Sequence, residues 1–196
     1  MQEVRNLLHL NLKGSMTKLS SRQAEPFLAF DRDGTLIRLI PYLRDSKEVV
    51  LMPGANDLVT KALELGFKTA LITNQSVIER GLGTHEQVQE VNAEVERRVF
   101  EGTGKGFDLI KYCPHLPSSE CKCRKPRTAL LESELNEGLI DLRRSFYVGD
   151  VETDVLFANN LGMNSILVTQ DFNRDSKASH IVYNLVEIIP ILKDIM

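Results

Sequence analysis

From Phe27 onward, short apolar runs alternate with longer segments whose apolar residues recur at helical spacing. Runs of about four to eight apolar residues are typical of buried strands, and recurrence at i, i+3 and i+4 is typical of amphipathic helices. This alternation predicts strand–helix–strand units, which build parallel sheets. The pattern predicts five strands, at 27–30, 68–72, 107–112, 145–148 and 165–168. It predicts helices at 54–65, 86–100, 128–135 and 153–161.

Nearly continuous apolar strands such as segment 69–72 favour a sheet that is covered on both faces. We therefore expect an α/β fold, a three-layer Rossmann-like sandwich around a five-stranded parallel sheet. Residues 1–26 lack this pattern, so we expect a flexible polar extension before one domain over 27–196. The glycine-rich segment 102–106 lacks the spacing of a P-loop and is interpreted as a connector.

The composition is that of an ordinary globular domain, with 42% hydrophobic and 26% charged residues, and this excludes a disordered or collagen-like chain. The formal net charge of −3 gives no broad basic field, so no nucleic-acid partner is expected. No apolar run approaches the roughly 20 residues that span a bilayer, so no membrane partner is expected either. Reduced thiols and the lack of a recognisable export signal predict a cytoplasmic protein, and a monomer is the default expectation.

Two acidic residues, Asp31 and Asp33, directly follow the first expected strand in a turn that contains Gly34. Carboxylates this close repel each other, and a hard cation with oxygen ligands can hold both. An ordinary turn with solvated acids is the alternative, because Asp-Gly is common in turns. Asp150 ends the fourth expected strand, and strand ends converge where the winding of such a sheet reverses. The three acids therefore predict a magnesium site.

The ends of the other strands offer groups that bind phosphate. The second strand is followed by hydroxyl and amide side chains, and two cations come after the third. These residues are Thr73, Asn74, Gln75, Ser76, Arg124 and Lys125. The predicted crevice therefore combines acids with positive charge.

All three cysteines, Cys113, Cys121 and Cys123, fall within eleven residues that also contain His115. An odd, clustered set favours a metal over disulfides, and one imidazole with three thiolates suits tetrahedral zinc. Such a site is closed and structural, and it would order the loop before Lys125. The alternatives are idle thiols with a surface histidine, or a redox pair, which the lack of a Cys-x-x-Cys disfavours.

Taken in order, these strand-end motifs resemble the four motifs of the haloacid dehalogenase (HAD) superfamily over about residues 27–170. The resemblance implies a magnesium-dependent phosphotransferase. Asp31 would be the nucleophile that forms an aspartyl phosphate, and Asp33 would be the general acid and base. Thr73 and Lys125 would bind the transferring phosphoryl group.

The same resemblance implies that Mg²⁺ is held by Asp31, the backbone carbonyl of Asp33, and Asp150, with Asp154 supporting them. The string from Cys113 to Pro126 resembles the zinc-bearing branch of the superfamily, the heptose-bisphosphate and histidinol-phosphate phosphatases. The intervals between the motifs leave no room for a separate cap domain.

The expected substrate is a small phosphorylated molecule of carbohydrate metabolism. Segment 73–81 and the region of Tyr42 resemble the heptose-bisphosphate branch, whereas the short spacer between His115 and Cys121 resembles the histidinol-phosphate branch. A heptose bisphosphate is favoured, histidinol phosphate is the alternative, and a non-catalytic, zinc-stapled phosphate-binding domain is the competing class. The residues expected to contact the substrate are Tyr42, Asn74, Gln75, Ser76 and Arg124.

Overall fold

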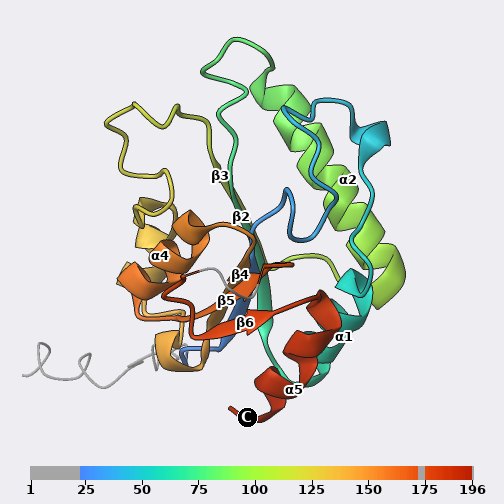
Figure 1. The fold of residues 1–196 in the computed structure, drawn as a ribbon, viewed down its shortest axis with the longest axis vertical. Coiled ribbons are helices and arrows are strands. Elements are labelled where there is room, and N and C mark those ends of the chain that lie inside the picture. The colour runs from blue at the N-terminus through green and yellow to red at the C-terminus, as the bar shows by residue number, and fades with distance from the viewer. Residues whose placement is uncertain (1–22, 172–174, 196) are drawn as a thin grey trace, which may run out of the picture.

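The computed structural model describes residues 23–171 and 175–195. In it, six parallel strands form one sheet in the spatial order β3-β2-β1-β4-β5-β6 (Figure 1). Their bounds are β1 (Phe27–Phe30), β2 (Lys68–Asn74), β3 (Leu109–Cys113), β4 (Phe146–Gly149), β5 (Asn164–Val168) and β6 (His180–Val182). The predicted α/β class and parallel sheet are confirmed.

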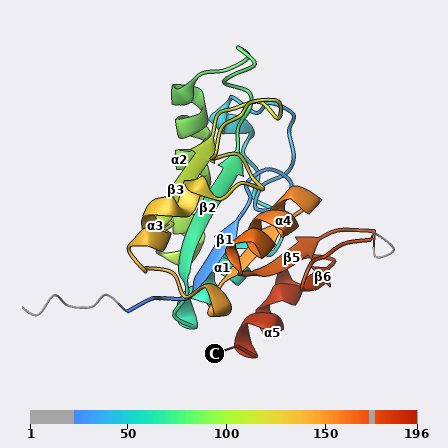
Figure 2. The ribbon, with the colours of Figure 1, turned by 90° about the vertical axis from the view of Figure 1, so that its left-hand side faces the viewer.

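Helices cover both faces of the sheet, as the two ribbon views show (Figures 1 and 2). They are α1 (Ala55–Glu64), α2 (His85–Thr103), α3 (Glu132–Asn136), α4 (Glu152–Leu161) and α5 (Ile188–Lys193). Alternation along β1 explains the three layers. Leu28 and Phe30 join the core beneath α1, α2 and α5, while Phe27 and Ala29 join the core beneath α4.

The sheet has a sixth strand where the sequence predicted only five. β6 is three residues long, and only Val182 in it is buried, so it shows no apolar run of strand length. The helix expected at 128–135 also differs, because it starts with a 3₁₀ turn at 129–131 and continues as α3. These are differences in detail within the predicted three-layer fold.

The segments that leave the carboxyl ends of the strands are loops with little structure of their own. Residues 31–54 lead from β1 to α1, residues 75–84 from β2 to α2, and residues 114–128 follow β3. Isolated bridges join Ile37 to Asp33 and to Leu51 within the first of them. The expectation that no separate cap domain is inserted is confirmed for these segments.

The described part of the chain starts before β1 and already contacts the domain there. Glu25 donates its N–H to the carbonyl of Leu139 at 3.0 Å and accepts from the N–H of Asp141 at 2.9 Å. Most of the predicted N-terminal extension, residues 1–22, lies outside the described residues. Among those described, no helix is long and apolar enough to cross a membrane.

Candidate active site and metal centre

The carboxyl ends of β1 and β4 place two acidic side chains next to each other. Phe30 pairs with Val148 in the parallel register, and the N–H of Asp31 donates to the carbonyl of Val148 at 2.9 Å. Asp150 directly follows β4, so it reaches the same edge of the sheet. The winding reverses between these strands, which is where ligands bind in open parallel sheets.

A cavity of about 250 Å³ opens at this point. It is lined by Asp31, Asp33, Leu39, Thr73, Asn74, Arg124, Lys125, Asp150, Val151, Thr153 and Asp154. The structure therefore gathers the acids, the threonine and both cations that the sequence singled out. Leu39, Val151 and Thr153 are additions to that set.

Lys125 is the cation at the floor of the crevice, and it is 3% exposed. Its Nζ lies 2.6 Å from Oδ1 of Asp31 and 2.7 Å from Oδ1 of Asp154. It also donates to the hydroxyl of Tyr147 at 2.6 Å and to the carbonyl of Ile72 at 3.0 Å. Burial by itself lowers the pKa of Lys125, but Asp31, Tyr147 and Asp154 together outweigh burial and hold that pKa well above its usual value. The ammonium therefore remains charged.

Three acids lie together here, and two of them, Asp31 and Asp154, contact the buried cation. Carboxylate oxygens of Asp31, Asp150 and Asp154 all lie within 4.8 Å of one another. Burial, reinforced by Asp31 and Asp154, raises the pKa of Asp150 to about 7. Burial also raises the pKa of Asp154 to about 6, against the opposing effect of Lys125. The excess of negative charge is what a divalent cation with oxygen ligands would neutralise, so the donor set fits Mg²⁺.

Gly34 is required by the close approach of the turn to Asp150. Its φ is +87°, and a Cβ at this position would lie 2.4 Å from Oδ2 of Asp150. Any larger residue would both strain the backbone and push the carboxylate away. The Asp-Gly pair is therefore part of the site and not an ordinary solvated turn.

Asp33 is held by a polar network from the neighbouring strand. Gln75 Nε2 donates to Oδ2 of Asp33 at 2.7 Å and to Oγ1 of Thr73 at 3.0 Å. Because the Thr73 hydroxyl accepts this bond, its own hydrogen is free to donate into the crevice. Burial raises the pKa of Asp33, and the adjacent Arg32 opposes that rise.

The residues expected to bind substrate lie in different places. Arg124 and Asn74 line the crevice, and Asn74 exchanges two hydrogen bonds with the backbone of Lys125, at 3.1 and 3.2 Å. Gln75 is instead buried against Asp33. Tyr42, with a left-handed φ of 54°, lies beneath the guanidinium of Arg80 and lines a neighbouring cavity. Ser76 accepts from Arg80 at 3.4 Å.

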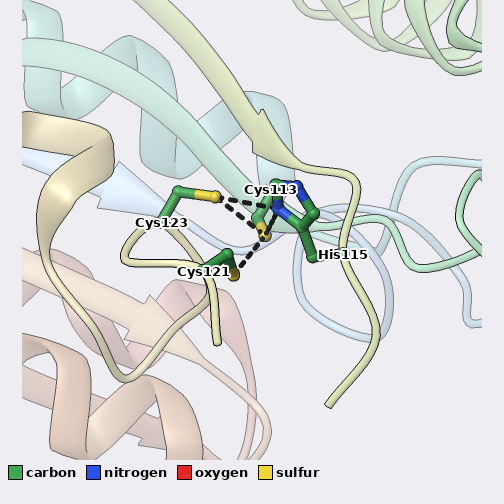
Figure 3. A group of neighbouring side chains, drawn as sticks. All are labelled: Cys113, His115, Cys121 and Cys123. Carbon is green, nitrogen blue, oxygen red and sulfur yellow. Dashed lines mark hydrogen bonds between the residues drawn. The ribbon is translucent and has the colours of Figure 1, made fainter. Parts of the chain in front are cut away.

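The cysteines and His115 form a compact cluster at the end of β3 (Figure 3). Sγ of Cys113 lies 3.8 Å from Sγ of Cys121 and 3.2 Å from Sγ of Cys123. His115 Nδ1 lies 3.2 Å from Sγ of Cys123. Tetrahedral zinc with Zn–S bonds of about 2.3 Å sets sulfur atoms about 3.8 Å apart, which the Cys113–Cys121 pair matches, while the Cys113–Cys123 pair is closer. Three thiols and one imidazole with their ligand atoms within 4.8 Å of one another are a donor set that suits zinc.

Neighbouring side chains tie this loop to the rest of the crevice. The Glu79 carboxylate, from the loop after β2, accepts from the Ser119 hydroxyl at 2.6 Å and from the N–H of Leu116. Arg124 donates to the carbonyl of His115 at 2.9 Å. The order of the loop and the position of Arg124 are therefore linked.

Sequence reasoning missed Arg32, Asn92 and Tyr147, which are buried polar residues around the site. Arg32 lies between two motif acids, but a charged residue in a turn is normally exposed. Tyr147 lies in an apolar strand, where an aromatic residue is ordinary. Only their spatial neighbours reveal a role, so the sequence pattern carried no signal for them.

Comparison with known proteins shows the family of this chain. A family model described as HAD-hydrolase-like matches residues 122–195. A relative from Thermoplasma volcanium, named a probable D-glycero-D-manno-heptose-1,7-bisphosphate 7-phosphatase, is 36% identical over 135 residues, which is 68% of this chain and 92% of the relative. The chain therefore belongs to the haloacid dehalogenase-like phosphatases, which are phosphoric monoester hydrolases.

Two further proteins are similar to this chain, one in sequence and one in fold. The bifunctional histidine biosynthesis protein HisB of Legionella pneumophila is 35% identical over 160 residues, which is 79% of this chain but 44% of that protein. A solved D,D-heptose 1,7-bisphosphate phosphatase from B. bronchiseptica, complexed with magnesium and phosphate, superposes with a TM-score of 0.76 at 23% identity. The superposition covers 86% of this chain and 98% of the other, and it supports the fold.

Proposed function

We propose that the protein is a Mg²⁺-dependent phosphatase that removes one phosphate from a heptose bisphosphate. The observation that carries this proposal is the convergence of Asp31, Asp150 and the buried Lys125 in one small crevice at the carboxyl edge of the sheet. A nucleophile, a fixed cation and a set of oxygen ligands are what phosphoryl transfer through an enzyme carboxylate requires.

In the proposed mechanism, a carboxylate oxygen of Asp31 attacks phosphorus, and the bond to the leaving oxygen breaks as an aspartyl phosphate forms. Asp33 gives a proton to the leaving oxygen and then takes one from the water that attacks the aspartyl phosphate. Lys125 and the free hydroxyl hydrogen of Thr73 hold the phosphoryl oxygens.

Asp31, Asp150 and the backbone carbonyl of Asp33 would hold Mg²⁺. When bound there, the ion would supply positive charge that offsets the charge of the phosphoryl oxygens. Burial and the neighbouring acids raise the pKa of Asp150, and this supports the assignment, because a bound cation would favour the charged carboxylate.

The heptose assignment follows the relatives that this chain covers almost completely. The Thermoplasma volcanium relative with the heptose-bisphosphatase name is covered over 92% of its length, whereas HisB of Legionella pneumophila is covered over 44%. Arg124 at the rim supplies a cation for the second phosphate, with Asn74 beside it. Histidinol phosphate is the alternative substrate, because the sequence identity to the histidine biosynthesis protein, 35%, is close to the 36% identity to the heptose-bisphosphatase relative.

We also propose that Cys113, His115, Cys121 and Cys123 hold one structural zinc ion. Three thiols and an imidazole fill all four tetrahedral positions, which leaves none for a catalytic water. Because thiolate ligands persist under reducing conditions, this site favours a cytoplasmic location.

The test is phosphate release by the purified protein with Mg²⁺ from D-glycero-D-manno-heptose 1,7-bisphosphate and from histidinol phosphate. We expect kcat/KM for the bisphosphate to be at least about tenfold higher, because a second phosphate adds a charge-assisted contact. A higher value for histidinol phosphate would reverse the substrate assignment. Phosphate binding without release from either compound would favour the non-catalytic alternative.

A further inference from the structure

Arg32 is the largest fully buried side chain described in the structure, although it carries a charge. Its Nη1 donates to Oδ1 of Asn92 at 2.8 Å, and its Nη2 donates to Oε1 of Gln75 at 2.7 Å. Its Nε donates to Oδ2 of Asp33 at 3.0 Å. Each nitrogen of the guanidinium thus has an acceptor, and a buried guanidinium satisfied in this way is held in one orientation.

The two carboxylate oxygens of Asp33 have different surroundings. Oδ2 accepts from Gln75 at 2.7 Å and from Arg32 Nε at 3.0 Å, and Arg32 Nη2 lies 2.9 Å away. Among residues 23–171 and 175–195, Oδ1 receives a single hydrogen bond, from Arg32 Nη2 at 3.3 Å. Since Asp33 lines the crevice, Oδ2 is anchored while Oδ1 remains available to a ligand.

Asn92 closes the network from α2. It is 3% exposed, and its Oδ1 accepts from Arg32. Its Nδ2 is buried and has no hydrogen-bond partner among the described residues. An apolar residue would fill the same helix position without an unsatisfied amide. The bond to Arg32 is therefore the contact that explains an asparagine here.

We propose that Arg32, Gln75 and Asn92 are positioning residues that fix Asp33 with Oδ2 anchored and Oδ1 as the proton-transferring oxygen. This inference rests on the proposed phosphatase function. As Asp31 bonds to phosphorus and the bond to the leaving oxygen breaks, the proton on Oδ1 of Asp33 passes to that oxygen. The carboxylate left on Asp33 then faces the charge of Arg32.

The test compares two substrates that differ in their need for that proton. A sugar phosphate releases an alkoxide, which must be protonated, whereas acetyl phosphate releases acetate, which departs without a proton. The measured quantity is kcat/KM, which covers the steps up to loss of the leaving group. A purely structural defect would lower both values by the same factor.

Asn92→Ala is expected to lower kcat/KM for the heptose bisphosphate by about tenfold, because general acid catalysis is worth about 10²–10⁴-fold and this variant weakens it without removing it. For acetyl phosphate the loss is expected to stay below about twofold. Asn92→Asp keeps the acceptor oxygen and should restore most of the lost activity. Asn56→Ala is the matched control, because Asn56 on α1 likewise has one buried amide atom without a partner, its Oδ1, but lies outside the crevice.

Equal losses on both substrates, or no loss on either, would overturn the proposal. In an Asp33→Asn background, Asn92→Ala should have no further effect on the sugar substrate, and an additive effect would also overturn it. If Asn92→Ala does not fold, Arg32→Lys tests the same point, because it keeps the charge and loses the planar fork.

If wild-type protein hydrolyses neither substrate, the proposed phosphatase function itself is wrong. If it hydrolyses only acetyl phosphate, the heptose assignment fails and histidinol phosphate replaces the sugar.

Discussion

The acidic crevice and the Cys/His cluster each gather metal-binding side chains within 4.8 Å, but they are built differently. The crevice acids come from the ends of β1 and β4 and from α4, which the sheet holds together. The cluster comes from eleven consecutive residues, of which only Cys113 lies in a strand.

The difference indicates which site depends on its metal for shape. Parallel pairing fixes Asp31 beside Asp150 whether or not a cation is bound, and burial together with repulsion from the neighbouring acids raises the pKa of Asp150. The loop residues of the cluster have no such scaffold, so zinc would supply the order there. Arg124 and Lys125 connect the two sites, because they directly follow Cys123 in the chain and their side chains line the crevice.

The largest expected effect follows from removing the buried cation. Lys125→Met leaves the carboxylates of Asp31 and Asp154 without their partner, and losing one member of a buried ion pair costs about 3–5 kcal/mol. Urea unfolding should show this loss in the free energy of unfolding. Lys105→Met, which breaks an exposed pair with Asp108, should change it by at most about 1 kcal/mol. Similar losses in both variants would contradict a buried, charged Lys125.

The next largest effect is expected from removing a zinc ligand in the Cys/His cluster. Cys123→Ser should lose the zinc, which elemental analysis should find at about one ion per wild-type chain. If the loss costs about 3 kcal/mol, the melting temperature should fall by about 6–12 °C for a chain of this size. Lys122 is an exposed neighbour, so Lys122→Ser is the control and should keep both the zinc and the wild-type melting temperature. Full zinc occupancy in Cys123→Ser would refute the ligand assignment.

A third prediction asks whether Arg124, which follows the Cys/His cluster, binds the second phosphate of the substrate in the crevice. Arg124→Ala should raise KM for the heptose bisphosphate by about tenfold, since hydrogen bonds to charged groups are worth about 1.5–3 kcal/mol. KM for a heptose monophosphate, which lacks the second phosphate, should stay near the wild-type value. The exposed Lys122→Ala is the control. An equal rise in KM for both substrates would show that Arg124 does not bind the second phosphate.

The smallest effect is the pH dependence of magnesium binding. The pKa of Asp150 is about 7 in the fold against an ordinary value of 3.8, so the fold retains a proton that the unfolded chain has lost. Without metal, stability therefore falls as pH rises from about 4 to 7, and it stays lower above that range. Mg²⁺ competes with this proton.

Mg²⁺ should consequently raise the melting temperature more at pH 7.5 than at pH 5, by about 2–4 °C if the difference is worth about 1 kcal/mol. Thermal unfolding at constant ionic strength measures this. Asp150→Asn should remove most of the pH dependence. An equal increment at both pH values would argue against a cation beside Asp150.

The sequence was a good guide where one local rule determines position. β1 has the predicted bounds, and Asp31 and Asp150 meet because parallel strands end at a common edge. The grouping of the cysteines and His115 was also predictable, because these residues are close in the chain.

Elements that depend on packing were not predictable. β6 is too short to show a pattern, and α5 packs against α1 from the far end of the chain. Gln75 was expected to contact substrate, yet it lies against Asp33, because a side-chain hydrogen bond leaves no trace in hydrophobic periodicity. The burial of Arg32 likewise depends on Asn92, which is sixty residues away in the chain.

The most direct test of the account is phosphate release from heptose bisphosphate by wild-type protein and Asp31→Asn, at equal zinc content and with Mg²⁺ present. If the Asp31 carboxylate attacks phosphorus, the variant should remain folded and lose at least about 1,000-fold in kcat, as expected when a nucleophile is removed. The exposed Asp57→Asn should be unchanged. Turnover by Asp31→Asn within about twofold of wild type would contradict the covalent mechanism.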